Sequence, residues 1–411
     1  MARRAIVDAR SLLPADSHLL PLSMAGFFTA VSRTQLPGYF SRPGSPRVTA
    51  KFDYLDTHDA SCLQIADHCN GLLLLHGLPL LPNGQRVLNP ATRKWEKLPP
   101  YPHLSTPGME GLHVMENMYL VFDPIVAPHY EVFLFTCVPF SGQDDDYDEP
   151  LDPSIRAMPW PPSPYILRVF SSKTQQWEQK PFIREGEAAG TIADMEWVLS
   201  SGHCYSAYWE GALYVHQHDF VIRITMLTEK FQVIKLPLGL HVGPYPKHHL
   251  GKSQNGAYCA LLYSDNDFGL RVWFLDESCG QIKWAPKCDI NLKTTLANFP
   301  RKVSTGPWMV QYANDEDDKR QASECSNNGT VIIPEIKPGA RYGRSHLSLL
   351  GFHPSREIVF LRTLFGRVVA YHFNDSKIED LGCLPLKDPR HWIDPPFVYT
   401  PCRKGDLSDK M

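Results

Sequence analysis

One hairpin pattern recurs along the chain and constrains its fold more than any other feature. In each copy, a short apolar strand leads into a four- to six-residue turn, and a bulky residue follows on the returning strand. The bulky positions are Trp95, Trp177, Phe231, Trp284 and Ile378. Phe231 lies 54 residues after Trp177 and 53 residues before Trp284. These spacings are close to the roughly 40–50 residues of one propeller blade, which is a four-stranded sheet.

The first complete copy of the pattern spans residues 69–99. Asn70-Gly71 predicts a turn because glycine adopts positive φ at no steric cost. Leu72–Leu75 is a continuous apolar run, which is typical of a strand covered on both faces. Asn89-Pro90 predicts a second turn, since asparagine can bond its own backbone and proline presets φ. We interpret the following residues as structural rather than reactive: Asn70, Gly71, Asn89, Pro90, Trp95, Trp177 and Trp284.

This periodicity predicts an all-β chain folded as a β-propeller. A single blade cannot bury both of its faces, whereas blades stacked around a ring bury each other, with the Trp and Phe positions between them. Five blades can be counted along the sequence. A sixth is expected from residues 48–66 together with 397–399, which would close the ring with strands from both ends; five or seven blades remain open. The alternative is an array of two-sheet sandwiches without a ring, which the periodic hairpin disfavours.

The chain outside the repeats divides into segments of different composition. Residues 1–25 have a partly helical apolar pattern broken by Pro14 and Pro21, which predicts a short helix near residues 3–13. Two acidic or proline-rich stretches predict long surface loops. The expected organisation is an N-terminal segment at 1–25, a Gly/Pro-rich linker at 26–45, a propeller at 46–403 with loops at 141–164 and 296–341, and a polar tail at 404–411.

Composition narrows the setting in which the chain works. The formal charge of −3 and the pI of about 6.6 give no support for nucleic-acid or membrane binding by bulk electrostatics. None of the ten cysteines forms a Cys-x-x-Cys pair, and no signal peptide or apolar run of about 18 residues occurs. We therefore expect reduced, buried thiols and a cytoplasmic or nuclear protein that is not secreted.

One pair of histidines is a candidate for metal binding. His216 and His218 alternate along one predicted strand and so share a face, but no third ligand is fixed by the sequence. A half-exposed strand face is the preferred interpretation. His248 and His249 follow a proline-rich stretch and are expected to face solvent. No metal and no cofactor is predicted.

Other candidate chemistry is equally sparse. Asp67, His68 and Cys69 are adjacent in sequence, but a buried thiol beside a turn histidine is preferred over a nucleophile pair. The acidic stretches 144–149 and 315–318 lack the glycine and glutamate positions of an EF-hand loop. No His-Glu-x-x-His, Walker or Gly-x-Ser-x-Gly element is present. One sparse basic set is too weak to indicate phosphate or nucleic-acid binding: Lys337, Arg341 and Arg344. No catalytic residue is predicted.

Residues 69–99 resemble the signature of plant F-box-associated domains. Two groups of residues carry this part of the resemblance: Cys69, Asn70, Gly71, Leu72 and Leu73, then Val87, Asn89, Pro90, Thr92, Trp95, Leu98 and Pro99. The segments at Trp177 and Trp284 and the closing stretch 397–402 are also similar to the grass branch of this family, so the resemblance covers about 45–403. The resemblance implies a kelch-like propeller. It also implies a protein-interaction role as the substrate-recognition part of a Skp–cullin–F-box ubiquitin ligase.

The chain departs from this family at its N-terminus. Residues 2–9 resemble only the last turn of an F-box, and the Leu-Pro start and Leu-rich helices of that module are missing. Residues 1–25 are therefore expected to be a remnant, left by gene truncation or by loss of the module. Docking to a Skp-type adaptor is not expected to be strong.

These observations lead to a non-enzymatic scaffold whose partner protein is unnamed. The two long loops, 141–164 and 296–341, are the expected contact regions, because loops on rigid scaffolds carry recognition. One alternative is a propeller-type enzyme with carboxylates or histidines converging at a central channel. Another is a regulatory paralogue that binds partners without recruiting a ligase.

Overall fold

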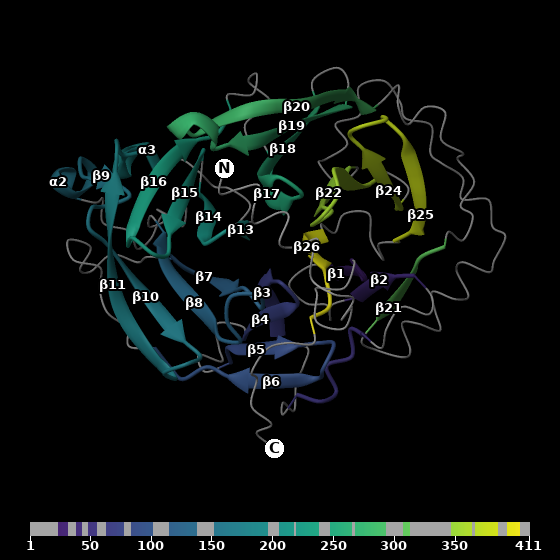
Figure 1. Ribbon diagram of the computed structural model, residues 1–411, viewed down its shortest axis with the longest axis horizontal. Coiled ribbons are helices and arrows are strands. Elements are labelled where there is room, and N and C mark those ends of the chain that lie inside the picture. The colour runs from purple at the N-terminus through teal and green to yellow at the C-terminus, as the bar shows by residue number, and fades with distance from the viewer. Residues whose placement is uncertain are drawn as a thin grey trace, which may run out of the picture.

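The structure is a ring of β-sheets, seen down its short axis in Figure 1. It is a computed structural model. The residues that it describes are 24–31, 38–42, 48–55, 63–77, 84–101, 115–137, 152–195, 205–217, 219–237, 247–264, 268–292, 307–312, 347–363, 366–384 and 393–402. Within them the chain is all-β and propeller-like, which confirms the predicted fold class. The predicted helix near residues 3–13 and the polar tail at 404–411 lie outside the described residues.

The described strands form six four-stranded units, numbered here in chain order with a closing unit last. The first unit is β3 (Leu63–Cys69), β4 (Leu72–Gly77), β5 (Arg86–Asn89) and β6 (Lys94–Lys97). The second is β7 (Met115–Phe122), β8 (Tyr130–Cys137), β10 (Tyr165–Ser171) and β11 (Gln176–Glu185). The third is β13 (Ser206–Trp209), β14 (Ala212–Gln217), β15 (Phe220–Thr225) and β16 (Lys230–Lys235).

The remaining units complete the ring. The fourth is β17 (Lys247–Ser253), β18 (Gly256–Ser264), β19 (Phe268–Asp276) and β20 (Lys283–Asn291). The fifth is β22 (Ser348–Phe352), β23 (Ile358–Arg362), β24 (Arg367–His372) and β25 (Ile378–Cys383). The closing unit is β26 (Ile393–Tyr399), β1 (Gly26–Val31), β2 (Gly38–Ser41) and β21 (Met309–Tyr312). Short elements beside the second unit are α2 (Pro153–Arg156), β9 (Pro159–Trp160), β12 (Gly190–Thr191) and α3 (Ile192–Met195), and a 3-10 turn, η2 (Ser278–Gly280), follows β19.

The innermost strands of these units meet around one axis. They contact each other in the cyclic order β3, β7, β13, β17, β22, β26 and back to β3, and they lie nearest the centre of Figure 1. At the rim, β11 and β16 pair in parallel from Ile183↔Lys230 to Glu185↔Gln232. This pairing joins the second and third units into one eight-stranded sheet.

The closing unit corrects two sequence predictions. Residues 26–45 are not a plain linker, because they contain β1 and β2, and residues 48–55 form no strand. The Gly/Pro pattern marks strand ends here, while the apolar residues between them are fully buried, as Phe27 and Phe40 show. The stretch 296–341 likewise supplies β21, the outer strand of this unit.

The recurring hairpins fold through two kinds of turn. Asn70-Gly71 and Glu210-Gly211 are two-residue turns in which both residues have positive φ, as type I′ hairpins require. The wider turns between the two outer strands of four units each place one positive-φ residue two positions before the bulky outer-strand residue. These residues are Arg93, Gln175, Glu229 and Ser376. The sequence repeat therefore corresponds to one repeated turn and strand geometry.

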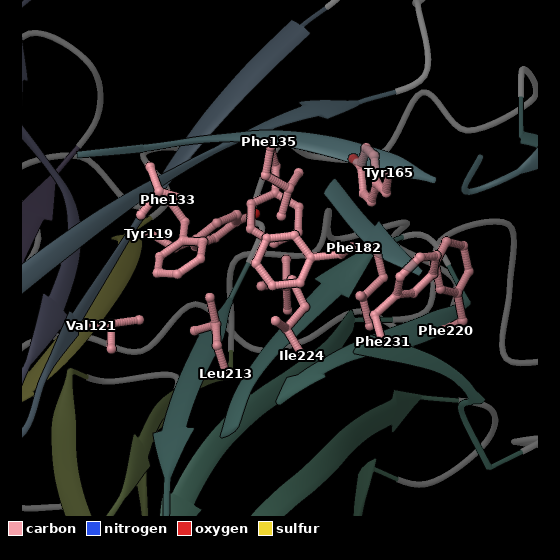
Figure 2. Close-up of a cluster of buried hydrophobic side chains, with 14 of the residues drawn as sticks. Tyr119, Val121, Phe133, Phe135, Tyr165, Phe182, Leu213, Phe220, Ile224 and Phe231 are labelled. Atoms are coloured by element: carbon pink, nitrogen blue, oxygen red, sulfur yellow. The ribbon is translucent and has the colours of Figure 1, made fainter. Parts of the chain in front are cut away.

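Hydrophobic clusters fill the spaces between neighbouring units. Figure 2 shows the cluster in which Phe133, Phe135 and Tyr165 of the second unit lie near Leu213 and Phe231 of the third. Tyr165 and Phe231 make an edge contact with ring centroids 5.9 Å apart. The bulky outer-strand position thus contributes to packing between units.

The two ends of the ring differ in their connections. Because neighbouring strands of a unit are antiparallel, turns after the first and third strands of the first five units, counted from the axis, lie at one end, called here the turn end. The connections after second and fourth strands leave from the opposite end, called here the loop end. Two strands that finish at the loop end are β8 and β21. They precede residues 138–151 and 313–346, which lie outside the described residues.

Candidate functional site

A polar network crosses the axis of the ring near the turn end. Asp67 lies on β3, just after a bulge at Ala66 that shifts the register between Ile65 and Asp67. Bulges re-aim side chains, and the Asp67 carboxylate accepts a 2.7 Å hydrogen bond from Leu120 N on β7. Ser206 Oγ on β13 lies 3.0 and 2.9 Å from the two carboxylate oxygens of Asp67. One carboxyl group therefore joins the inner strands of three units.

A second contact spans the ring from the first unit to the fourth. Lys252 Nζ on β17 donates to Asn70 Oδ1 in the turn between β3 and β4. Asn70 Nδ2 donates at 2.6 Å to the main-chain oxygen of Phe122 at the end of β7. Because β3 and β17 are not neighbours in the ring, this bond shows that polar side chains bridge the axis here.

Burial controls the electrostatics of this network. Desolvation raises the pKa of Asp67 from 3.8 to about 7, against the lowering effect of its hydrogen bonds. Burial lowers the pKa of His68 to about 3, with the Lys252 cation acting in the same direction. Burial also raises the pKa of the Cys69 thiol to about 12. The thiol donates at 3.3 Å to Phe122 O and is therefore not an activated nucleophile.

His68 and Cys69 do not form a reactive pair. Both lie on β3 rather than in a turn, so adjacent side chains point to opposite faces. The His68 ring packs on Phe397 of β26, with ring centroids 4.9 Å apart. The preferred sequence interpretation, a buried thiol, is correct, and the expected turn position of the histidine is wrong.

The other candidate histidines that the structure describes lie on strands of the third and fourth units. His248 and His249 lie on β17, so the prediction of a solvent-facing loop is wrong, and burial lowers the pKa of His248 to about 4. The His216 ring on β14 lies 6.2 Å from that of His248. His218 lies outside the described residues. In the described part of the chain, no group of three or more His, Cys, Asp or Glu side chains is placed to hold a metal ion.

The signature residues form the seam between the first unit and the end of the described chain. Asn89 is buried, and its Nδ2 donates at 2.8 Å to Cys402 O. Its Oδ1 accepts a hydrogen bond from Ala91 N at 3.0 Å and so stabilises the turn that begins at Pro90. Gly71 faces the same segment, because a Cβ there would lie 2.5 Å from Cys402 Cβ.

The three tryptophans of the recurring hairpin pattern each link an outer strand to the segment before it in the ring. Trp95 Nε1 donates at 3.1 Å to Tyr54 O, in a segment that packs on the closing unit. Trp177 Nε1 donates at 2.9 Å to Pro99 O of the first unit. Trp284 Nε1 donates at 2.9 Å to Lys235 O of the third unit. Each indole therefore combines packing with a backbone hydrogen bond.

Sequence reasoning missed the partners in the axial network. Ser206 and Lys252 lie 139 and 182 residues from the side chains that they bind, and no local pattern marks either one. The acidic stretches 144–149 and 315–318, and the basic set of Lys337, Arg341 and Arg344, lie outside the described residues. Among the residues described, no helix is both long and apolar enough to cross a membrane.

Comparisons with known proteins add little to this picture. No family model matches the chain, and no curated protein matches its sequence. Apo AztD from Citrobacter koseri is similar in structure with a TM-score of 0.32 and 10% identity, over 89% of this chain and 73% of that one. A putative 6-phosphogluconolactonase from Bacteroides fragilis has a TM-score of 0.29 and 10% identity, over 90% and 96%. Likenesses this distant carry no argument about function.

Proposed function

We propose that this chain is a non-enzymatic protein-interaction module related to the plant F-box-associated propellers that its sequence resembles. In that role it holds a partner protein, in the cytoplasm or nucleus, as the substrate-recognition part of a Skp–cullin–F-box ligase. A regulatory paralogue that binds the same partner without the ligase is the variant of this proposal in which the adaptor does not dock.

The observation that supports the proposal is that the signature residues make structural contacts within the ring. Asn70, Gly71 and Asn89 lie in or beside turns, and these three residues and Trp95 all contact another segment of the ring. The motif that carries the resemblance therefore builds a scaffold, as expected if family members share a ring and differ in what they bind. The axial Asp67, His68 and Cys69 are likewise engaged in contacts between strands.

The loop end is the proposed recognition face. The strands before residues 138–151 and 313–346, which are β8 and β21, finish there, and these stretches contain 14 and 34 residues. The turn end carries mostly short hairpins, which offer a partner less exposed chain than long loops do.

The test begins with identification of partners by cross-linking the full chain in plant extract. A variant with residues 141–150 replaced by an equally long Gly/Ser linker is then compared with the parent chain. We expect at least tenfold weaker binding of the identified partner, with an unchanged unfolding temperature.

A double substitution at the turn end provides the control. Val126→Ser and Leu227→Ser alter side chains that are 79% and 92% exposed, and they are expected to leave binding unchanged. If the control loses the partner and the linker variant keeps it, the loop-end proposal is wrong.

Binding of the chain to a purified Skp-type adaptor tests whether it assembles with the ligase. Binding as tight as that of an intact F-box protein assigns the chain to the ligase. Loss of binding, with the partner still held, assigns it to the regulatory variant. If the chain retains no protein partner, the module proposal itself fails.

A further inference from the structure

Asp67 is placed in an unusual way for a carboxylate. Only 3% of the residue is exposed, and no ion pair to it is found among the described residues. An ionised carboxylate has room for about four hydrogen bonds, whereas the donors here are Leu120 N, the main-chain N–H of His68 and the Ser206 hydroxyl. A buried charge without a counter-ion is costly, and protonation is the usual way to remove that cost.

Ser206 makes both protonation states compatible with the site. Its oxygen lies almost equally far from the two carboxylate oxygens, at 3.0 and 2.9 Å. A hydroxyl is both donor and acceptor. Ser206 therefore donates to an ionised Asp67 and accepts from a protonated Asp67 without moving, while Leu120 N keeps its own bond.

Three titratable neighbours of Asp67 have pKa values outside the range between about 4 and 7. Burial sets the pKa of His68 at about 3 and that of Cys69 at about 12, and it raises the pKa of Tyr208 on β13 to about 12. Two oppositely charged side chains also act on this region, the Lys252 cation on β17 and the Asp123 carboxylate after β7. On β26 the neighbours are Phe397 and Val398, which do not titrate.

We propose that Asp67, which links inner strands of three units at the axis of the ring, is protonated in the folded protein. The unfolded chain releases this proton. The first three units are then held together most firmly when Asp67 is neutral, and ionisation of this one group destabilises the ring. This inference is independent of the proposed partner binding.

The linkage has a definite sign. Folding raises the pKa of Asp67 from 3.8 to about 7. Between these values the folded state binds one more proton than the unfolded state, so stability falls as pH rises. Relative to a variant without this group, the unfolding equilibrium constant should rise about tenfold per pH unit from about 4 to 7 and then level off.

The experiment compares urea unfolding of the parent chain and of Asp67→Asn from pH 4.5 to 8.5. Taking the ratio of unfolding constants cancels the contributions of histidines common to both chains. We expect the ratio to rise about a hundredfold or more over this range. A ratio that stays constant with pH overturns the proposal.

Infrared spectroscopy tests the same proton without unfolding. The carbonyl stretch of a protonated carboxyl group should disappear from the parent spectrum with a midpoint near pH 7, and Asp67→Asn should lack it. If the variant fails to fold, the parent titration alone decides: no protonated carboxyl above pH 5.5 overturns the proposal.

Two further variants separate proton binding from a merely structural role. Ser206→Ala removes a donor that favours the ionised form, so the infrared midpoint should move to higher pH; an unchanged midpoint contradicts the assignment. Asp194→Asn is the matched control. Asp194 is exposed and accepts a hydrogen bond from Thr191 N at 2.7 Å, which lowers its pKa. The ratio of the unfolding constants of the parent chain and Asp194→Asn should therefore stay constant above pH 5.

Discussion

At the scale of single residues, alanine substitutions at two glycines in equivalent turns distinguish the cost of backbone strain from the cost of a steric clash. Gly71 has φ +96° and Gly211 has φ +81°, each as the second residue of a two-residue hairpin. A Cβ at Gly211 meets nothing within 4 Å, whereas one at Gly71 collides with Cys402. Gly211→Ala should therefore cost about 1 kcal/mol, the price of a left-handed residue with a side chain.

Gly71→Ala should cost at least about 1 kcal/mol more, because the segment at Cys402 must move as well. Urea unfolding at neutral pH measures both variants. Equal losses would show that residues 400–402 do not pack against the turn in solution.

At the scale of elements, the outer strands test how units are joined. Trp177→Phe and Trp284→Phe keep an aromatic ring in place but remove the indole N–H that binds Pro99 O or Lys235 O. Trp209→Phe is the control, because the Trp209 indole makes no hydrogen bond within the described residues and also packs partly buried between units. Each of the first two variants should lose about 1 kcal/mol more than the control in chemical unfolding. Three similar losses would leave packing as the only role of these side chains.

The same elements show how far sequence patterns reach. Asn70-Gly71 and Asn89-Pro90 could be predicted as turns because φ preferences are local. The strands β1 and β2 were missed because each is short and flanked by glycine and proline, and their pairing partners lie at 309–312 and 393–399. His248 and His249 were missed as strand residues because the proline-rich residues before them resemble a loop.

The candidate site was less predictable than the fold for a related reason. The sequence predicted a buried thiol at Cys69, which is confirmed, but it gave no sign that Asp67 is buried as well. Ser206, which binds Asp67, and Lys252, which binds Asn70, are brought close by the inner strands that meet at the axis. The bulge at Ala66 decides where Asp67 points. Periodicity indicates blades, but it does not specify the register between them.

At the scale of the whole molecule, closure of the ring depends on the last described residues. β26 pairs with β1 from Gly26↔Tyr399 to Val31↔Ile393 and also contacts β3 and β22 on either side. Asn89 then binds Cys402 O beyond the end of this strand. A ring whose units stabilise each other loses more than one unit when its closing inner strand is removed.

A pair of truncations tests this dependence. A chain ending at residue 392 lacks β26 and should unfold at a temperature at least about 10 °C lower, or fail to fold, because both neighbouring units lose a buried face. A chain ending at residue 402 keeps β26 and the Asn89 contact, and should unfold within about 2 °C of the parent. Thermal unfolding followed by circular dichroism, with limited proteolysis of β3 and β22, measures the effect. If the two truncated chains unfold at the same temperature, β26 is not the closing strand in solution and the ring must be held by contacts among the other five units.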